Sequence, residues 1–180
     1  ALFSIEGMDE QIKRMLGDSK AIDRSRDFIS EWLNLNRLKN LKPNSKKFPN
    51  WQPELAIDMQ DETLEFFEDL AWKQNRPLAD LFNAQFTYAS TRLANHYDLD
   101  NSSPRSQRHD LSEHPGRGGI LTHGSTLTVG GDEASMVSRG LFVLHDLLRG
   151  VVNDPPPCVN TTPPETKAGL TQRGIAEERV

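Results

Sequence analysis

The sequence predicts a mainly α-helical protein, an irregular multi-helix bundle with at most one short β-hairpin and a proline-rich extended arm. Apolar residues recur at helical spacing in four separate segments, which indicates four amphipathic helices. Residues that favour β-structure are concentrated only within 120–129, too few for a larger sheet. A chain of 180 residues is long enough to bury a hydrophobic core without a metal or a disulfide.

The first two helices are predicted at 8–16 and 20–39. Gly17 and Asp18 end the first, and Ser19 is placed to cap the second. Each helix carries one apolar stripe, which consists of Met8, Ile12, Met15 and Leu16 in the first and of Ile22, Phe28, Ile29, Trp32, Leu33 and Leu35 in the second. A loop rich in proline and asparagine follows at 42–50.

A long helix is predicted at 53–74. Pro53 suits the first helical position, and Glu54 interacts favourably with the helix dipole. The apolar stripe consists of Leu55, Met59, Thr63, Phe66 and Leu70. A separate acidic stripe includes four carboxylates within reach of one another, Asp58, Asp61, Glu62 and Glu65. Such carboxylates can serve acid–base catalysis or bind a divalent metal, but no nucleophile or base accompanies them, so we expect a solvated helix face.

Shorter elements complete the chain. Helices are predicted from Pro77 to Phe82, at 89–97 and at 133–149, the last ended by Gly150. The stretch 98–119 is polar and rich in turn-forming residues. Glycines confine the β-forming residues of 120–129 to short extended pieces, which allow at most one hairpin. Three prolines at 155–157 favour a polyproline II arm that runs extended to 164. The expected core consists of Phe28, Trp32, Leu33, Met59, Phe66, Phe67, Leu70, Leu141 and Leu144.

Composition excludes several classes of partner and cofactor. The 26 acidic and 21 basic residues give a formal charge of −5, which argues against nucleic acid as a partner. No apolar stretch approaches the ~20 residues that span a bilayer, so no direct membrane insertion is expected. The single cysteine, Cys158, rules out an internal disulfide and a multi-cysteine metal site. The spacing of His109, His114 and His123 does not suit a metal site either, so no metal is expected.

Several short motifs follow one another in a fixed order. The most specific reads RGGILTHGS at 117–125. The others read RMLGD at 14–18, FISEWLNL at 28–35, ETLEFF at 62–67, FTY at 86–88, LANHY at 93–97, RG at 139–140 and PPP at 155–157. Together they resemble the middle region of the large multidomain cytochrome c-like proteins of planctomycetes and related bacteria, catalogued as domains of unknown function 1592 and 1588. The resemblance covers about Ile12 to Pro157 and departs at Met136, where the family usually has proline.

The resemblance implies an extracytoplasmic parent protein, periplasmic or secreted, that is linked to haem. In relatives a Cys-x-x-Cys-His haem-attachment sequence lies downstream of the proline-rich arm, whereas this chain contains none. We therefore expect a fragment with no cofactor of its own, haem c in the downstream part of the parent, and other domains or chains of the same parent as partners. The expected division is a helical domain at 1–100, a glycine-rich loop with a helix packed on it at 101–154, and a linker at 155–180.

The most specific candidate site is the arginine that glycines flank at 116–119. Gly118 and Gly119 permit a close backbone approach and positive φ. Arg117 can then grip a carboxylate, a phosphate or a haem propionate of a neighbouring domain, with Arg139 nearby. The alternative is a structural turn in which these arginines bind buried carbonyls or a partner carboxylate.

Cys158 interrupts the proline-rich arm and has no partner cysteine in this sequence. In an oxidising compartment it is a candidate for a disulfide with another part of the parent, or for a chemically accessible thiol. The alternative is a small buried thiol that fills a gap under the arm.

Three functions remain open at this point. The first is a helical scaffold or interaction module that positions a downstream cytochrome c-like domain. The second is part of a substrate pocket, built from Arg117, His123 and Arg139, in an oxidoreductase whose redox centre lies outside this chain; the resemblance implies no known reaction. The third is an extracellular polymer-binding module with stacking surfaces supplied by Trp51, Trp72 and Tyr88.

Overall fold

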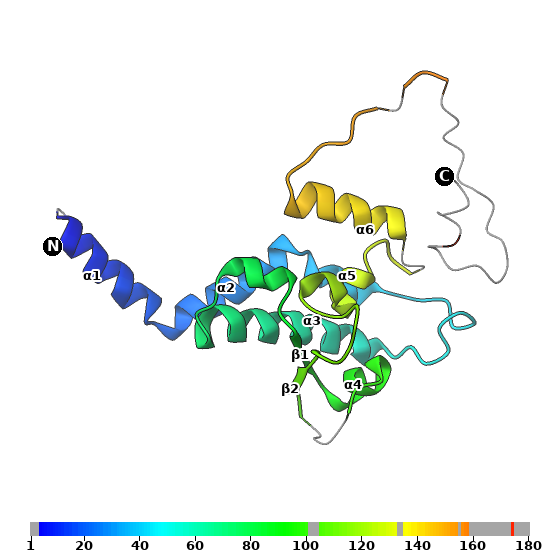
Figure 1. Cartoon of the computed structure of the whole chain (residues 1–180), viewed down its shortest axis with the longest axis horizontal. Coiled ribbons are helices and arrows are strands. Elements are labelled where there is room, and N and C mark those ends of the chain that lie inside the picture. The colour runs from blue at the N-terminus through cyan, green and yellow to red at the C-terminus, as the bar shows by residue number, and fades with distance from the viewer. Residues whose placement is uncertain (1–3, 101–104, 133–134, 155, 159–173, 175–180) are drawn as a thin grey trace.

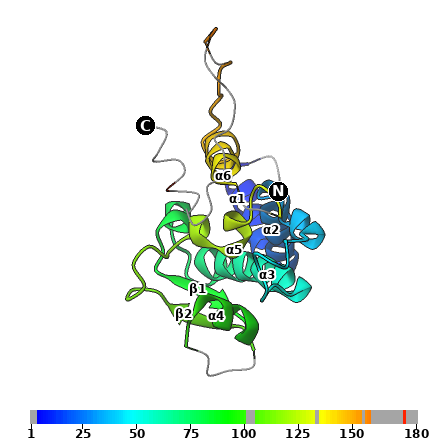
Figure 2. The same ribbon diagram turned by 90° about the vertical axis from the view of Figure 1, so that its right-hand side faces the viewer.

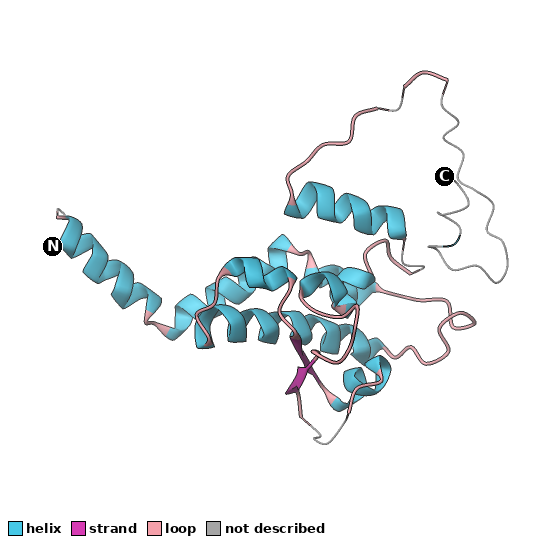
Figure 3. Cartoon of the chain, viewed as in Figure 1, coloured by secondary structure: helices cyan, strands magenta, loops and turns pink. Residues whose placement is uncertain are grey.

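The molecule is organised around one long helix, α3 (Pro53–Glu68), which continues as a π-helical turn, η2 (Asp69–Lys73). The computed structural model describes residues 4–100, 105–132, 135–154, 156–158 and 174. Within these residues helices predominate and two short strands form the sheet (Figure 3). The predicted mainly α-helical class is therefore confirmed.

Two helices precede α3, namely α1 (Ile5–Leu16) and α2 (Ser19–Trp32). Ser4 caps α1, and Asp18, rather than the predicted Ser19, caps α2 through its carboxylate. The prediction of one helix to residue 39 is wrong, because Asn34 is left-handed with a φ of 49° and a 3₁₀ helix, η1 (Leu35–Asn40), follows it. Figure 1 shows α1 projecting away from the body, whereas α2 packs along α3.

Helix α3 begins as predicted, with Pro53 at its first position. The predicted extent to residue 74 is confirmed by α3 and η2 together. The buried face consists of Leu55, Ala56, Met59, Glu62, Thr63, Leu64, Phe66 and Phe67. The expectation that Glu62 lies on a solvated face is wrong, since this residue is only 2% exposed. It follows Met59 by three positions and precedes Phe66 by four, so helical geometry places all three on one side.

The sheet consists of β1 (Phe86–Ala89) and β2 (Gln107–Asp110), paired antiparallel with Phe86 opposite Asp110. A 3₁₀ helix, η3 (Leu78–Phe82), precedes β1, and α4 (Thr91–Tyr97) lies between the two strands in sequence, both close to the predicted helices. Strand β2 falls in the segment that was expected to be polar and rich in turns. The two strands are therefore joined through a helix and not by a tight hairpin turn.

The short hairpin that the sequence allowed within 120–129 does not form. This segment forms a 3₁₀ helix, η4 (Ile120–Thr122), and one helical turn, α5 (Gly124–Leu127). Three threonine hydroxyls donate to carbonyls of the same segment, namely Thr122 to Gly119, Thr126 to Ile120 and Thr128 to Gly124. Such local hydrogen bonds compete with strand pairing, which explains why β-forming residues here adopt helical turns.

The last helix is α6 (Met136–Phe142), which continues as a π-helical turn, η5 (Val143–Leu147), within the predicted range 133–149. The predicted role of Gly150 in ending this helix is taken by Arg149, which is left-handed with a φ of 56°. The indole nitrogen of Trp32 donates to the carbonyl of Asp146 over 3.1 Å and links this segment to α2. Figures 1 and 2 place α6 and α4 on opposite sides of α3.

Two clusters of buried apolar residues form the core. The first contains Ile29, Leu33, Leu35, Leu64, Phe66, Phe67, Leu70, Leu81, Ala84, Phe86 and Ile120. The second contains Leu38, Leu55, Ala56, Met59, Ala89, Leu93, Ala94, Leu99 and Leu111. Both draw on α3, so this helix ties the N-terminal helices to the sheet and the glycine-rich loop.

The predicted core is confirmed at five positions, Leu33, Met59, Phe66, Phe67 and Leu70. It is wrong at Phe28 and Leu141, which are 62% and 38% exposed. Trp32 and Leu144 are only partly buried. The reason is geometric: α3 covers one side of α2, and the apolar stripe of α2 is wider than that side, so Phe28 is left to stack against Trp32 at the surface.

Most of the proline-rich arm predicted at 155–164 lies outside the described residues, and the division into domains stays a prediction. Within the described part, Cys158 is exposed, so the alternative of a buried thiol is wrong. Of the described helices, none combines the length and the apolar character that crossing a membrane requires.

Candidate functional site

A loop after β2 returns the chain to the C-terminal end of α4 and carries Arg117. Gly118 and Gly119 both have positive φ, 145° and 65°. The amide of Gly119 donates to the carbonyl of Ala84 over 3.0 Å, and the amide of Gly118 donates to the hydroxyl of Thr122 over 2.9 Å. A side chain at Gly119 would place its Cβ 2.3 Å from the carbonyl carbon of residue 82, so only glycine fits there.

This loop places the guanidinium of Arg117 over the ring of Tyr97, 3.9 Å from the ring centroid. A cation in this position is attracted by the π-electrons of the ring. The Tyr97 hydroxyl in turn donates to the carboxylate of Glu62 over 2.7 Å. The predicted candidate Arg117 therefore stands at the outer end of a polar network that reaches into the core.

Glu62 is the centre of this network. Its Oε1 accepts a hydrogen bond from the Thr87 hydroxyl over 2.7 Å, and its Oε2 accepts from the Tyr97 hydroxyl and from the amide of Gly124 over 3.2 Å. The Gly124 amide also donates to the Tyr97 oxygen over 2.7 Å. Glu62 thus joins α3 to β1, α4 and α5, and three donors satisfy a carboxylate that would otherwise be costly to bury.

Burial raises the pKa of Tyr97 well above its usual range, and the charge and hydrogen bond of Glu62 raise it further. Tyr97 therefore keeps its proton at physiological pH and stays a donor to Glu62. From the sequence, Glu62 was considered only as one of the carboxylates of the acidic stripe, and Tyr97 was not a site candidate. The helical spacing of Glu62 with Met59 and Phe66 indicates that Glu62 faces the core. Its partner Tyr97 is distant in the sequence, so no local pattern predicts that the two residues meet.

His123, a predicted candidate, is 2% exposed and lies beside the same network. Its Nδ1 is 3.2 Å from the Thr63 hydroxyl, which also contacts the Ser125 hydroxyl over 2.7 Å. Its ring packs edge-on against Phe66, with centroids 4.8 Å apart, and its Nε2 is buried without a hydrogen-bond partner among the described residues. A histidine this buried cannot touch a substrate at the surface, so its role in this arrangement is structural.

Burial lowers the pKa of His123, Arg117 lowers it further, and Glu62 partly opposes both effects. The unfolded chain therefore takes up a proton near the ordinary histidine pKa of about 6.5, while the folded chain does not. We expect the free energy of unfolding to be highest above pH 6.5 and to fall below it, by at most about 1.4 kcal/mol per pH unit for this one group.

Urea denaturation at pH 7.5 and pH 5.5 tests this expectation. His123→Asn keeps a polar atom near Thr63 but does not titrate, so it should reduce the difference between the two pH values. His145→Asn, at an exposed position, is the matched control and should leave the difference unchanged. An equal pH dependence in all three proteins would contradict the prediction.

The structure does not bring Arg139 to the other candidates. Arg139 lies in α6, on the opposite side of α3 from α4 and Tyr97 (Figures 1 and 2). The Arg117, Gly118 and Gly119 positions lie together, and His123 lies behind them in the core. The expectation that Arg139 stands near Arg117 is therefore not supported, because α6 and α4 lie on opposite sides of α3 (Figures 1 and 2).

The histidines near the loop do not come together as ligands. Strand β2 buries His109, whereas His114 is exposed. Across the described ranges, no three histidine, cysteine, aspartate or glutamate residues are grouped as a metal ion would require.

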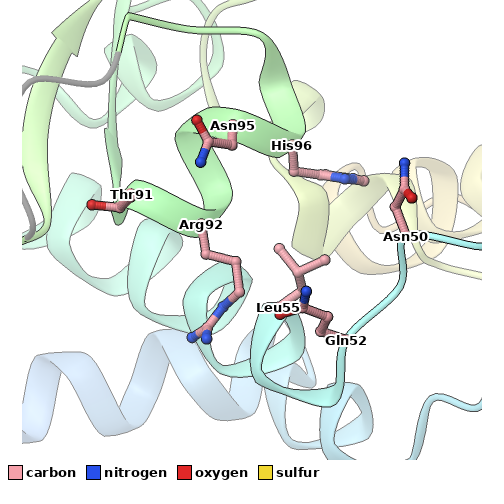
Figure 4. A pocket seen from close by; sticks show the side chains of 7 residues that line it. All are labelled: Asn50, Gln52, Leu55, Thr91, Arg92, Asn95 and His96. Atoms are coloured by element: carbon pink, nitrogen blue, oxygen red, sulfur yellow. The ribbon is translucent and has the colours of Figure 1, made fainter.

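Two open hollows lie beside α4 and the segment that leads into α3. A hollow of about 580 Å³ is lined by Asn50, Gln52, Leu55, Thr91, Arg92, Asn95 and His96 (Figure 4). A second hollow of about 450 Å³ shares Asn50 and His96 with it and continues over Phe48 and Trp51. From the sequence, Trp51 was a candidate stacking residue, whereas Asn50, Gln52 and His96 were not candidates for binding.

Among the described residues, the fold and the Glu62 network define a mainly helical module with a buried polar network inside an otherwise apolar core. Residues 1–99 match the model of a protein of unknown function (DUF1592), and residues 117–180 match that of a second protein of unknown function (DUF1588). The first match covers more than half of the chain, so the chain belongs to the DUF1592 family. Comparison with curated proteins and with solved structures found no match.

These two families are the cytochrome c-associated domains of planctomycete-type proteins, and the resemblance seen in the sequence is confirmed. The chain is thus a module of the kind found in multidomain cytochrome c-like proteins.

Proposed function

We propose that this chain is a helical scaffold that docks and positions other domains of an extracytoplasmic, haem-linked parent protein. The observation that supports this proposal is the apolar side of α1, whose five large side chains are 46–82% exposed. They are Ile5, Met8, Ile12, Met15 and Leu16. An amphipathic helix whose apolar face has no cover is a typical docking element.

A second apolar surface lies on the body. A hollow of about 410 Å³ is lined by Phe28, Ile29, Trp32, Phe67, Leu78, Ala79, Leu81 and Phe82. Its lining is almost entirely apolar, which favours a protein surface as its partner over a charged ligand. Together with α1 it gives the scaffold two faces on which a neighbouring domain of the parent can pack.

We also propose that haem c is held by another domain of the parent and not by this chain. A single cysteine cannot form the two thioether bonds of a Cys-x-x-Cys-His sequence, so the residues of this chain do not fit covalent haem. Cys158 is exposed, and we propose that it pairs with a cysteine of that parent in an oxidising compartment.

The structure offers less support to the other two functions. A substrate pocket of Arg117, His123 and Arg139 would need three residues that lie on different sides of α3 or inside the core. The stacking surface of Trp51, Trp72 and Tyr88 would need all three rings to be accessible. Trp72, however, packs against the core with its indole nitrogen bonded to Ser25, and Tyr88 is also partly buried there.

Hydrogen–deuterium exchange of α1 tests the scaffold proposal. The amides of α1 should exchange at least about tenfold more slowly in the parent protein than in the isolated chain, because a docked domain covers the helix. Ile12→Asp with Met15→Asp should abolish this protection in the parent while the amides of α3 stay protected.

Arg14→Asp is the matched control, since it adds the same charge on the polar side of the same helix and should leave the protection intact. Equal exchange of α1 in the parent and in the isolated chain would overturn the proposal.

A further inference from the structure

The two open hollows described above share Asn50 and His96 in their linings and are together termed the groove. The segment that leads into α3 lines both hollows. Helix α4 completes the lining of the first, and Thr128, Gly131 and Asp132 complete that of the second together with His96. Figure 4 shows the His96 ring extending toward Asn50, with Gln52 at the entrance to α3. A volume of several hundred Å³ is the usual size of a small-molecule site.

The groove offers a ligand little net charge. The guanidinium of Arg92 is held by both carboxylate oxygens of Asp58, at 2.6 and 3.0 Å. Lys47 and Asp132, which also line the groove, have opposite signs. Burial lowers the pKa of His96, and the nearby Arg117 lowers it further, so this imidazole is neutral at physiological pH. An anionic or cationic ligand therefore gains no strong ion pair in this groove.

One half of the groove is apolar and aromatic. Trp51 is half-buried, packed against the second core cluster, and Phe48 is 42% exposed at the rim. The thioether side chain of Met59 lines the same part. Aromatic side chains of this kind offer flat apolar surface at a low cost in conformational entropy.

The polar groups beside this surface share one chemical property. Asn50 and Gln52 are exposed side-chain amides, and His96 is a neutral imidazole, so each of the three can both donate and accept a hydrogen bond. Hydroxyl groups have the same dual character. A purely apolar ligand would leave these groups without partners, at a cost in binding free energy.

We propose that this groove binds a neutral saccharide, with the C–H face of a sugar ring on Trp51 and its hydroxyls bonded to Asn50, Gln52 and His96. A sugar ring combines an apolar face with a rim of uncharged donor–acceptor groups, which matches both halves of the groove. The site is independent of the docking faces on α1 and α2, so this inference goes beyond the scaffold function.

Calorimetric titration of the chain with cello-, xylo-, manno- and maltopentaose tests the proposal, with dextran sulfate as the charged comparison. At least one neutral pentaose should bind at a single site and change tryptophan fluorescence. Asn50→Ala with Gln52→Ala should weaken binding by about tenfold, the effect of two lost hydrogen bonds. Both positions are exposed, and circular dichroism verifies that the variant is folded.

Trp51→Phe should remove the change in fluorescence while Trp32 and Trp72 remain. Asn36→Ala, at an exposed asparagine outside the groove, should bind as the unmodified chain does. The proposal is overturned if no neutral pentaose binds at millimolar concentration, if the double variant binds equally well, or if dextran sulfate alone binds.

Discussion

Glu62→Ala is expected to lower the free energy of unfolding by about 3–5 kcal/mol, because it removes the acceptor that three buried donors share. The Thr87 hydroxyl, the Tyr97 hydroxyl and the Gly124 amide would each lose a partner in a largely buried site. The loss of the carboxylate would also weaken the contacts of α3 with all three elements, β1, α4 and α5. Urea denaturation followed by circular dichroism measures the effect.

Glu62→Gln separates hydrogen bonding from packing. The amide oxygen can still accept from Tyr97 and Gly124, and the amide nitrogen can donate to Thr87, whose hydroxyl can turn to accept. This variant should therefore be destabilised less than Glu62→Ala.

Asp61→Ala is the matched control, one residue away on the exposed side of the same helix. The pKa of Asp61 is raised by burial and then by the nearby Glu65, so its charge is not stabilising in the folded state. The change in the free energy of unfolding should stay within about 0.5 kcal/mol. Equal effects of Glu62→Ala and Asp61→Ala would contradict the central place of Glu62.

Gly119→Ala is expected to destabilise the chain by at least about 3 kcal/mol, because left-handed strain adds to a clash that cannot relax. The new Cβ would lie 2.3 and 2.4 Å from the carbonyl carbon and oxygen of Phe82 and 2.7 Å from the carbonyl oxygen of Leu81. These are backbone atoms, so no side-chain rotation can remove the contact. The loop would have to move away from η3 and lose the hydrogen bond from Gly119 to Ala84.

Gly116→Ala is the matched control in the same loop. Gly116 also has a positive φ, 85°, but nothing lies within 4 Å of the position that its Cβ would take. It should cost only the backbone strain, about 1 kcal/mol. If thermal denaturation shows equal losses for the two alanine variants, the close packing of Gly119 against η3 is not what stabilises this loop.

Glu62→Ala and Gly119→Ala also test what holds Arg117 in position. Gly119 fixes the loop against η3, and Glu62 fixes Tyr97, the ring on which Arg117 stacks. Each variant should therefore disturb one side of the contact between Arg117 and Tyr97, which links the candidate loop to the buried network.

The sequence by itself determined the mainly helical class, the start of α3 at Pro53 and the family to which the chain belongs. These properties depend on residues close together in the chain, where helical periodicity, capping and short motifs act. It also indicated Arg117, Gly118 and Gly119 as special, since an arginine among glycines is a local pattern.

Only the tertiary structure decided which polar residues meet. Glu62, Thr87, Tyr97 and Gly124 come from four elements that converge on one point, and no spacing within the chain predicts that convergence. The hairpin considered at 120–129 did not form for a related reason, because threonine hydroxyls donate to carbonyls within their own segment. The strands formed instead at 86–89 and 107–110. Arg139 was separated from Arg117 because α3 lies between them. Local patterns fix the conformation of a segment, whereas the neighbours of a side chain depend on how all the segments pack.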